Sequence, residues 1–371
     1  MKNLKLIGFL MIMASSLMFI QCTSDVITGP QGTAGIDGTD GVDGTDGTNG
    51  VDGTNGVGAE SCITCHSESH RESIESSYAL SGHANQTIMY TGQTVAEYTN
   101  GVSASCTECH TNEGYINYVT GQLAAQADIP TAVSCTTCHD SHSTFDFEND
   151  GNDFALRSFE PVPLRKVNPD YVIDYGDKSN TCISCHQPRT IPILDAVEVD
   201  NGDGTFTTVE DGFIEVPNRY GPHYGAQSIM LEGIYGAEIA GSTTYPTAVS
   251  SAHRNGASCI SCHMGEPNDN DGQHSMVATF TSCVSCHGDG TGTLITNLQT
   301  EIDGYMAELE VLFEAKGLLV DGNLVYNVDY PVAVADAYWN YKFVYYDHSK
   351  GVHNPAYTRA ILKNSIEALQ P

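Results

Sequence analysis

The chain has 371 residues, and its 46 acidic and 15 basic side chains give a formal net charge of −31 at pH 7. Nucleic acid needs cationic side chains that neutralise its phosphates, so this balance excludes nucleic acid as a partner. The charge predicts a soluble surface that attracts cationic partners or metal ions. An acidic exterior that is merely solvated is an equal alternative.

The first residues have the pattern of an export signal. Lys2 and Lys5 precede an apolar run over residues 6–20, which is too short to cross a bilayer comfortably. We therefore expect a signal peptide over residues 1–21. Cys22 follows at the position of a lipoprotein cysteine, and we expect lipidation there, since stable anchoring takes more than one acyl chain; ordinary cleavage with an incidental cysteine is the alternative. Thr23, which is not acidic, directly follows Cys22, and this favours an outer-membrane lipoprotein facing the periplasm or the cell surface.

Residues 22–58 contain a strict repeat after the predicted anchor. Glycine recurs at every third position from Gly29 to Gly56, which is the collagen spacing, because only glycine fits at the axis of three wound chains. Pro30 is the only proline in this stretch, so polyproline geometry is poorly preset. We expect a flexible acidic spacer, with a collagen-like triple helix that makes a trimer as the alternative.

Twelve of the thirteen cysteines lie in six copies of Cys-x-x-Cys-His. Two thiols three positions apart can add to the two vinyl groups of one porphyrin, and the next histidine then falls beneath the iron. Zinc knuckles, disulfides and thioredoxin-like motifs would not require a histidine after every second cysteine. The pattern therefore predicts six covalently attached haem c groups. The predicted thioether cysteines are Cys62, Cys65, Cys106, Cys109, Cys135, Cys138, Cys182, Cys185, Cys259, Cys262, Cys283 and Cys286, and the predicted proximal ligands are His66, His110, His139, His186, His263 and His287.

Eight of the fourteen histidines lie outside the motifs and are candidates for the second axial position. Small or turn-forming neighbours let several of them approach a flat porphyrin closely. His70 and His142 lie too near their own motifs to reach the far face of the same haem, so either could serve only a neighbouring one. We expect bis-histidine ligation throughout and no catalytic residue. The predicted distal ligands are His83, His142, His223, His253, His274 and His353, and His70 and His348 remain as surface or adjacent groups.

Residues 59–371 are expected to form one hexahaem cytochrome c domain, mainly α with long loops and organised by haem stacking. Residues 197–199 and 205–208 alternate around a glycine-rich turn, which predicts a small β-hairpin insertion. Three C-terminal helices are expected at the end of the domain. They span residues 294–313, with a stop at Gly317, then 333–346 and 357–369, and the aromatic stripe Tyr338, Tyr341 and Tyr345 is expected to pack against a helix or a porphyrin.

Three segments resemble those of multihaem cytochromes related to pentahaem nitrite reductase and hydroxylamine oxidoreductase. They are Tyr-Gly-Pro-His-Tyr-Gly at 220–225, Ser-Ala-His at 251–253 ahead of the fifth motif, and Gly-Val-His-Asn-Pro at 351–355. The resemblance implies closely stacked haems that form a conducting chain, and it implies that the isolated histidines in these segments are distal ligands. Ammonia-forming nitrite reductases usually carry a catalytic Cys-x-x-Cys-Lys motif, which this sequence lacks.

The leading functional prediction is an exported, membrane-anchored electron carrier with six bis-histidine haems of low reduction potential. Its partners would be other redox proteins or an extracellular electron acceptor. One alternative is a reductase of nitrogen or sulfur oxyanions, which would need one haem with an open axial position. Another is a subunit of a polymeric cytochrome wire, in which a neighbouring subunit donates a distal histidine.

Overall fold

The computed structural model describes residues 62–63, 66–84, 87–88, 93–94, 102–123, 125, 130–142, 154–193, 196–200, 206–210, 212–264, 274–278 and 280–370. The chain divides into two units, Met1–Thr54 and Asn55–Pro371, and every described residue belongs to the second. The predicted signal peptide, Cys22, the glycine repeat and Cys65 lie outside the described residues. Among the helices that are described, none is both long and apolar enough to cross a membrane.

Short helices carry the motifs, as expected from the need to place two thiols on one helical turn. Motifs 2 to 6 lie on or at α4 (Ala104–His110), α6 (Cys135–Cys138), α7 (Asn180–Ile183), α10 (Cys259–His263) and α11 (Phe280–His287). Motif 1 precedes α3. The remaining short helices are α3 (Glu68–Tyr78), α5 (Asn112–Val119), α8 (Gln227–Glu232) and α9 (Ala252–Gly256).

The strands of the described chain form two-stranded antiparallel ladders. Four of them pair neighbouring segments: β1 (Thr87–Ile88) with β2 (Gln93–Thr94), β3 (Val162–Leu164) with β4 (Asn168–Ile173), β5 (Ala196–Asp200) with β6 (Phe206–Glu210), and β8 (Leu319–Val320) with β9 (Asn323–Leu324). The β5–β6 pair, with Val199 opposite Thr207, confirms the predicted hairpin strands. The fifth ladder joins β7 (Phe213–Val216) to the distant β10 (Val328–Pro331) and so attaches the C-terminal part to the middle of the chain.

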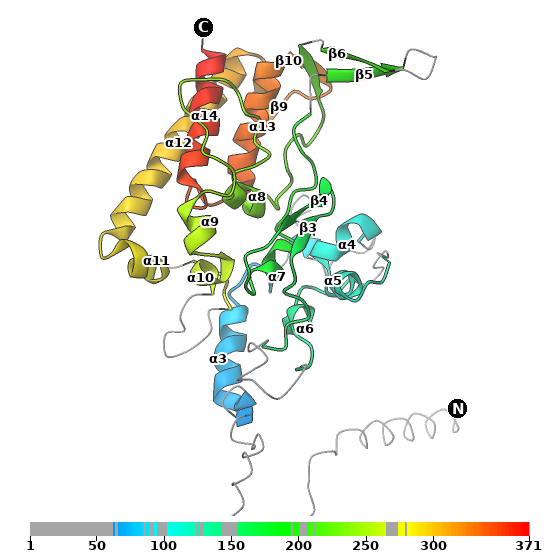
Figure 1. Cartoon of the computed structure of the whole chain (residues 1–371), viewed down its shortest axis with the longest axis vertical. Coiled ribbons are helices and arrows are strands. Elements are labelled where there is room, and N and C mark those ends of the chain that lie inside the picture. Colours follow the sequence, from blue (N-terminus) through cyan, green and yellow to red (C-terminus); the bar gives the residue numbers. More distant parts are fainter. Residues whose placement is uncertain are drawn as a thin grey trace, which may run out of the picture. The chain divides into compact units, whose positions relative to one another are not determined.

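Three long helices make up the C-terminal part, and Figure 1 shows them side by side. They are α12 (Thr291–Ala315), α13 (Val332–Asp347) and α14 (Pro355–Leu369), within a few residues of the predicted bounds. Gly317 follows α12 with a φ of +75°, a conformation that glycine adopts without a Cβ penalty. At α14 the Asn354 side chain accepts a hydrogen bond from the Tyr357 amide and caps the helix, and Pro355 follows at its first position.

The hydrophobic core lies between these helices and the segments that pack on them. Trp339, Phe313 and Phe343 are fully buried, and the Trp339 indole nitrogen donates to the Tyr235 carbonyl at 2.9 Å. Two members of the predicted aromatic stripe, Tyr338 and Tyr341, pack against α12, whereas Tyr345 is half exposed and stacks on Tyr341. The Tyr338 ring meets Phe313 edge-on at 5.4 Å between centroids. Tyr341 stacks on Tyr338 and also contacts Phe313. Tyr338 and Tyr341 therefore pack against a helix, one of the two arrangements predicted from the sequence.

The continuous core begins at Val162, and no described residue before it joins this cluster. The described part of residues 62–142, which holds three of the six motifs, is therefore poor in buried apolar side chains of its own. A chain segment that buries little apolar surface cannot offset its conformational entropy unaided. The described side chains of this part therefore form no continuous core of their own.

Candidate haem sites

Each motif histidine in the structure faces one histidine from outside the motifs. In every pair the two ring centroids lie 5.9–6.3 Å apart, and no histidine belongs to two pairs. The pairs, which we number as sites 1 to 6 in the chain order of their motifs, are His66–His142 at 6.1 Å, His110–His223 at 6.2 Å, His139–His274 at 6.3 Å, His186–His83 at 6.1 Å, His263–His353 at 6.2 Å and His287–His253 at 5.9 Å.

This spacing fits one metal ion between each pair of rings. A metal bound at about 2 Å by each of two facing imidazole nitrogens holds the ring centroids about 6 Å apart. The separations range from 5.9 to 6.3 Å, which is the value expected for an iron with histidine on both sides. The six outer histidines are the same six that the sequence predicts as distal ligands.

The partner in each pair comes from a different part of the chain. His142 lies three residues after His139 of motif 3, yet its ring faces His66 of motif 1. His83 follows motif 1 and faces His186 of motif 4. The segment with His139 and His142 thus contributes to sites 3 and 1, and the segment with His66 and His83 contributes to sites 1 and 4. These shared segments link the sites to one another.

The two remaining histidines do not face another histidine in the described structure. His70 is exposed on α3. The ring of His348, just after α13, lies 6.2 Å from the ring of Tyr345. This agrees with the expectation that both are surface or adjacent groups.

Hydrogen bonds to Nδ1 orient five of the paired rings. A histidine that donates from Nδ1 keeps Nε2 free to bind a metal, and the acceptor also fixes the plane of the ring. Sequence reasoning missed these acceptors, because nothing in local spacing identifies them. The contacts are His139 to the Phe154 carbonyl at 2.8 Å, His253 to the Val352 carbonyl at 2.7 Å, His263 to the Met276 carbonyl at 2.8 Å, His186 to Gln227 Oε1 at 3.1 Å and His353 to Asp347 Oδ1 at 2.6 Å.

Burial keeps several of these rings in the neutral form that binds metal. Desolvation, with a smaller contribution from His186, lowers the pKa of His83 to about 4. Desolvation, followed by the charge of Arg189, lowers the pKa of His223 to about 4. His353 differs: burial alone would lower its pKa, but the charge and hydrogen bond of Asp347 raise it above the usual value. A metal ion competes with protons for the same nitrogen, so the neutral rings are ready ligands.

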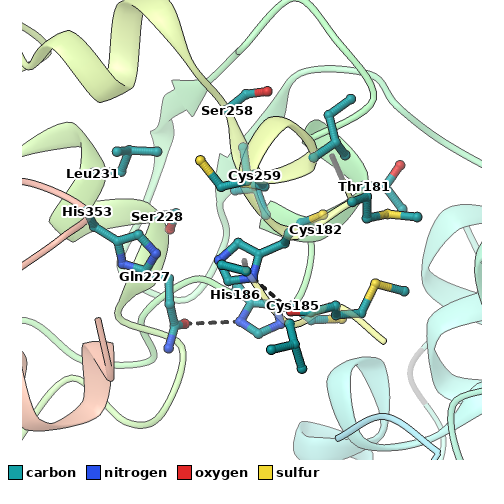
Figure 2. A pocket seen from close by; sticks show the side chains of 18 of the residues that line it. Thr181, Cys182, Cys185, His186, Gln227, Ser228, Leu231, Ser258, Cys259 and His353 are labelled. Atoms are coloured by element: carbon teal, nitrogen blue, oxygen red, sulfur yellow. Dashed lines mark hydrogen bonds between the residues drawn. The ribbon is translucent and has the colours of Figure 1, made fainter. Parts of the chain in front are cut away.

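Thiols of different motifs lie next to one another. The Cys185 side chain lies beside Cys109, and the Cys182 side chain lies beside Cys259. These contacts, followed by burial, raise the pKa of both motif 4 thiols well above the usual range. Figure 2 shows Cys182 and Cys259 on adjoining segments, with Gln227 bonded to His186 beside them.

Electrostatic interactions between cysteines indicate the remaining pairs of neighbouring motifs. Cys138 of motif 3 lies close enough to raise the pKa of Cys185. Cys283 of motif 6 likewise raises the pKa of Cys262, after the larger effect of burial. Motif 4 therefore borders motifs 2, 3 and 5, and motif 5 borders motif 6.

All six sites open into one cavity of about 3240 Å³, which is lined by residues of every motif and by all six outer histidines. Typical small-molecule sites measure roughly 300–1,000 Å³, so this space suits several large prosthetic groups. Three lining side chains carry buried polar atoms without a hydrogen-bond partner among the described residues: Tyr115 Oη, Arg165 Nε and Nη1, and Ser228 Oγ. Buried polar atoms rarely lack a hydrogen-bond partner in a native protein. Cavity, thiols and facing imidazoles together fit covalently bound haem.

No protein-family model matches the chain, and no curated protein sequence matches it. Solved structures do. The outer cell wall cytochrome OcwA superposes with a TM-score of 0.51 at 20% identity, over 79% of this chain and 50% of that one. An undecahaem cytochrome from the S-layer of Carboxydothermus ferrireducens gives 0.40 at 17% identity, over 72% and 38%. A cytochrome c nitrite reductase from Desulfovibrio desulfuricans gives 0.36 at 16% identity, over 81% and 69%.

The likeness to OcwA concerns the fold, since the two sequences are only 20% identical and this chain spans half the length of that protein. The chain has the fold of a multihaem c-type cytochrome, mainly helical with little sheet. The resemblance to multihaem cytochromes seen in the sequence therefore extends to the three-dimensional structure.

Proposed function

We propose that the chain is an exported hexahaem c-type cytochrome that transfers electrons through six bis-histidine sites. The observation that carries this proposal is the one-to-one facing of six motif histidines by six others at 5.9–6.3 Å. Haem supplies reversible one-electron chemistry when it is bound. The motif cysteines would hold it through thioethers, the facing histidines would bind its iron from both sides, and the hydrogen bonds at Nδ1 would orient those rings.

The thiol neighbours suggest an order for the electron path. Motif 4 borders motifs 2, 3 and 5, and motif 5 borders motif 6. Site 1 joins at site 3, because His142 of site 1 and His139 of site 3 are three residues apart. We infer a path from site 1 through sites 3, 4 and 5 to site 6, with site 2 as a branch at site 4. Site 4 is then the junction of the array.

The same pairing favours a carrier over the alternatives. An oxyanion reductase needs a haem with one open or weakly filled side, whereas every motif histidine in the described chain faces a second imidazole. A wire built by donated ligands needs a site completed by another subunit, and these six pairs form within one chain. An electron carrier needs neither an open haem nor a ligand from another subunit.

The destination of the protein is proposed from its N-terminal pattern. We infer export by the signal peptide of residues 1–21, an outer-membrane anchor at lipidated Cys22, and a glycine-repeat spacer that holds the haem domain away from the membrane or joins three chains. Covalent haem attachment outside the cytoplasm agrees with export. The partners would be other redox proteins or an extracellular electron acceptor, and the acidic surface would favour cationic ones.

Carbon monoxide tests the closed axial positions. The mature protein is expected to carry six haem adducts by intact mass, and its reduced spectrum is expected not to change when carbon monoxide is added, because imidazole occupies both sides of each iron. Tight binding of carbon monoxide to one haem in six would favour the reductase alternative. Fewer than six adducts would contradict the hexahaem assignment itself.

A further inference from the structure

Asp347 is a buried carboxylate that contacts one of the paired histidines directly. Its side chain is fully buried, and Oδ1 lies 2.6 Å from Nδ1 of His353. The other oxygen, Oδ2, accepts from the Ser349 amide at 3.3 Å and from the Ser349 hydroxyl. The two carboxyl oxygens of Asp347 thus contact one ring nitrogen of His353 and two donors of Ser349.

The position of Asp347 is costly unless it has a partner. It is the last residue of α13, where the helix dipole already places partial negative charge. Burial of a charge at such a place is unfavourable unless the charge is paired and hydrogen-bonded. The contacts with His353 and Ser349 supply hydrogen-bond partners, so the carboxylate is held against a ligand ring rather than left in solvent.

Other paired histidines of the described chain are anchored differently. His139, His253 and His263 donate to backbone carbonyls, and His186 donates to the amide oxygen of Gln227. These four acceptors are neutral, whereas the acceptor for His353 carries a full negative charge. Site 5, formed by His263 and His353, is thereby set apart.

We propose that Asp347 lowers the reduction potential of the iron held at site 5, and so makes that site a low-potential step between site 4 and site 6. The inference rests on the proposed bis-histidine haem at this site. A carboxylate hydrogen-bonded to a ligand imidazole raises the basicity of that ligand. Its negative charge, shielded from water, also favours the ferric over the ferrous state. Asp347 acts through His353 and is a positioning residue for that iron.

The test is a redox titration of the full-length holoprotein with EPR and visible detection. Asp347→Asn keeps the shape of the side chain and an oxygen for Nδ1 but removes the charge. One of the six midpoints is expected to rise by about 59 mV, the one-electron equivalent of a tenfold change, with all irons still low-spin. Asp329→Asn, which removes the same charge from an exposed position on β10, is the matched control and is expected to shift no midpoint.

Ser349→Ala gives a second test with the opposite sign. Loss of the hydroxyl that donates to Oδ2 leaves more negative charge for His353, so the same midpoint is expected to fall. An unchanged midpoint in Asp347→Asn, an equal shift in Asp329→Asn, or a rise in Ser349→Ala would overturn the inference. Conversion of one iron to high spin in Asp347→Asn would also overturn it, since Asp347 would then only hold the ring in place. A wild-type protein without six low-spin irons would instead contradict the proposed function.

Discussion

Replacement of His83 by alanine is expected to convert one of the six proposed low-spin irons to high spin while the proposed count of six haems stays unchanged. The His83 ring faces His186 at 6.1 Å, and its removal leaves site 4 with a single protein ligand. The thioethers of Cys182 and Cys185 would keep the haem attached. EPR of the ferric protein measures the spin states, and carbon monoxide binding to the reduced protein is expected to rise from none to one per chain.

The matched control for this experiment is His70→Ala. His70 lies on α3 a short distance before His83 in the chain, but it is exposed and faces no histidine among the described residues. The control is therefore expected to keep six low-spin irons and to bind no carbon monoxide. A wholly low-spin His83→Ala protein, or a high-spin iron in His70→Ala, would contradict the ligand assignment at site 4.

Replacement of Trp339 by alanine is expected to lower the free energy of unfolding by about 3–5 kcal/mol, the usual loss for a large aromatic side chain removed from a core. Trp339 is fully buried on α13 and contacts Tyr220 at 5.3 Å between ring centroids. Its indole nitrogen bonds to the Tyr235 carbonyl, so the substitution also leaves that acceptor without this donor. Urea unfolding followed by far-ultraviolet circular dichroism measures the loss.

Val311→Ala serves as the control for Trp339. Val311 lies on α12 with 66% of its surface exposed, and surface substitutions of this kind usually change stability by less than about 0.5 kcal/mol. A loss below about 1 kcal/mol for Trp339→Ala would mean that the C-terminal helices do not depend on this core. The haem spectrum of both variants reports whether the axial ligands are still in place.

Local sequence patterns predicted the secondary structure of the C-terminal part well, because apolar periodicity and helix stop signals are local. Leu298, Ile302, Leu309 and Phe313 recur at helical spacing, and all four are buried on α12. The hairpin strands of β5 and β6 followed from residue alternation in the same way. These features depend on neighbours within one or two turns of the chain.

The candidate sites were predictable only in part. A count of histidines outside the motifs could select His142 or His353 as a ligand, but it could not give their partners. The pairing of His66 with His142, or of His263 with His353, depends on contacts between segments far apart in the sequence. Asp347 could not be identified at all, since a carboxylate at a helix C-terminus has no distinguishing local pattern. Only the tertiary structure gives the pairing of the histidines and the contact of Asp347 with His353.

The distribution of the core has a physical consequence for folding. The continuous apolar cluster of the described chain starts at Val162, although motifs 1 to 3 precede it. We infer that the haem groups fill the interior of that half in place of apolar side chains. Folding of the N-terminal half would then depend on haem attachment.

Near-infrared magnetic circular dichroism of the ferric protein tests the central claim most directly, because its charge-transfer bands distinguish the axial ligand pairs of haem iron. Six bis-histidine haems would give a single type of low-spin signal, that of histidine on both sides, with an intensity equal to six haems per chain. A high-spin signal, a histidine–methionine signal, or an intensity below six haems would contradict it.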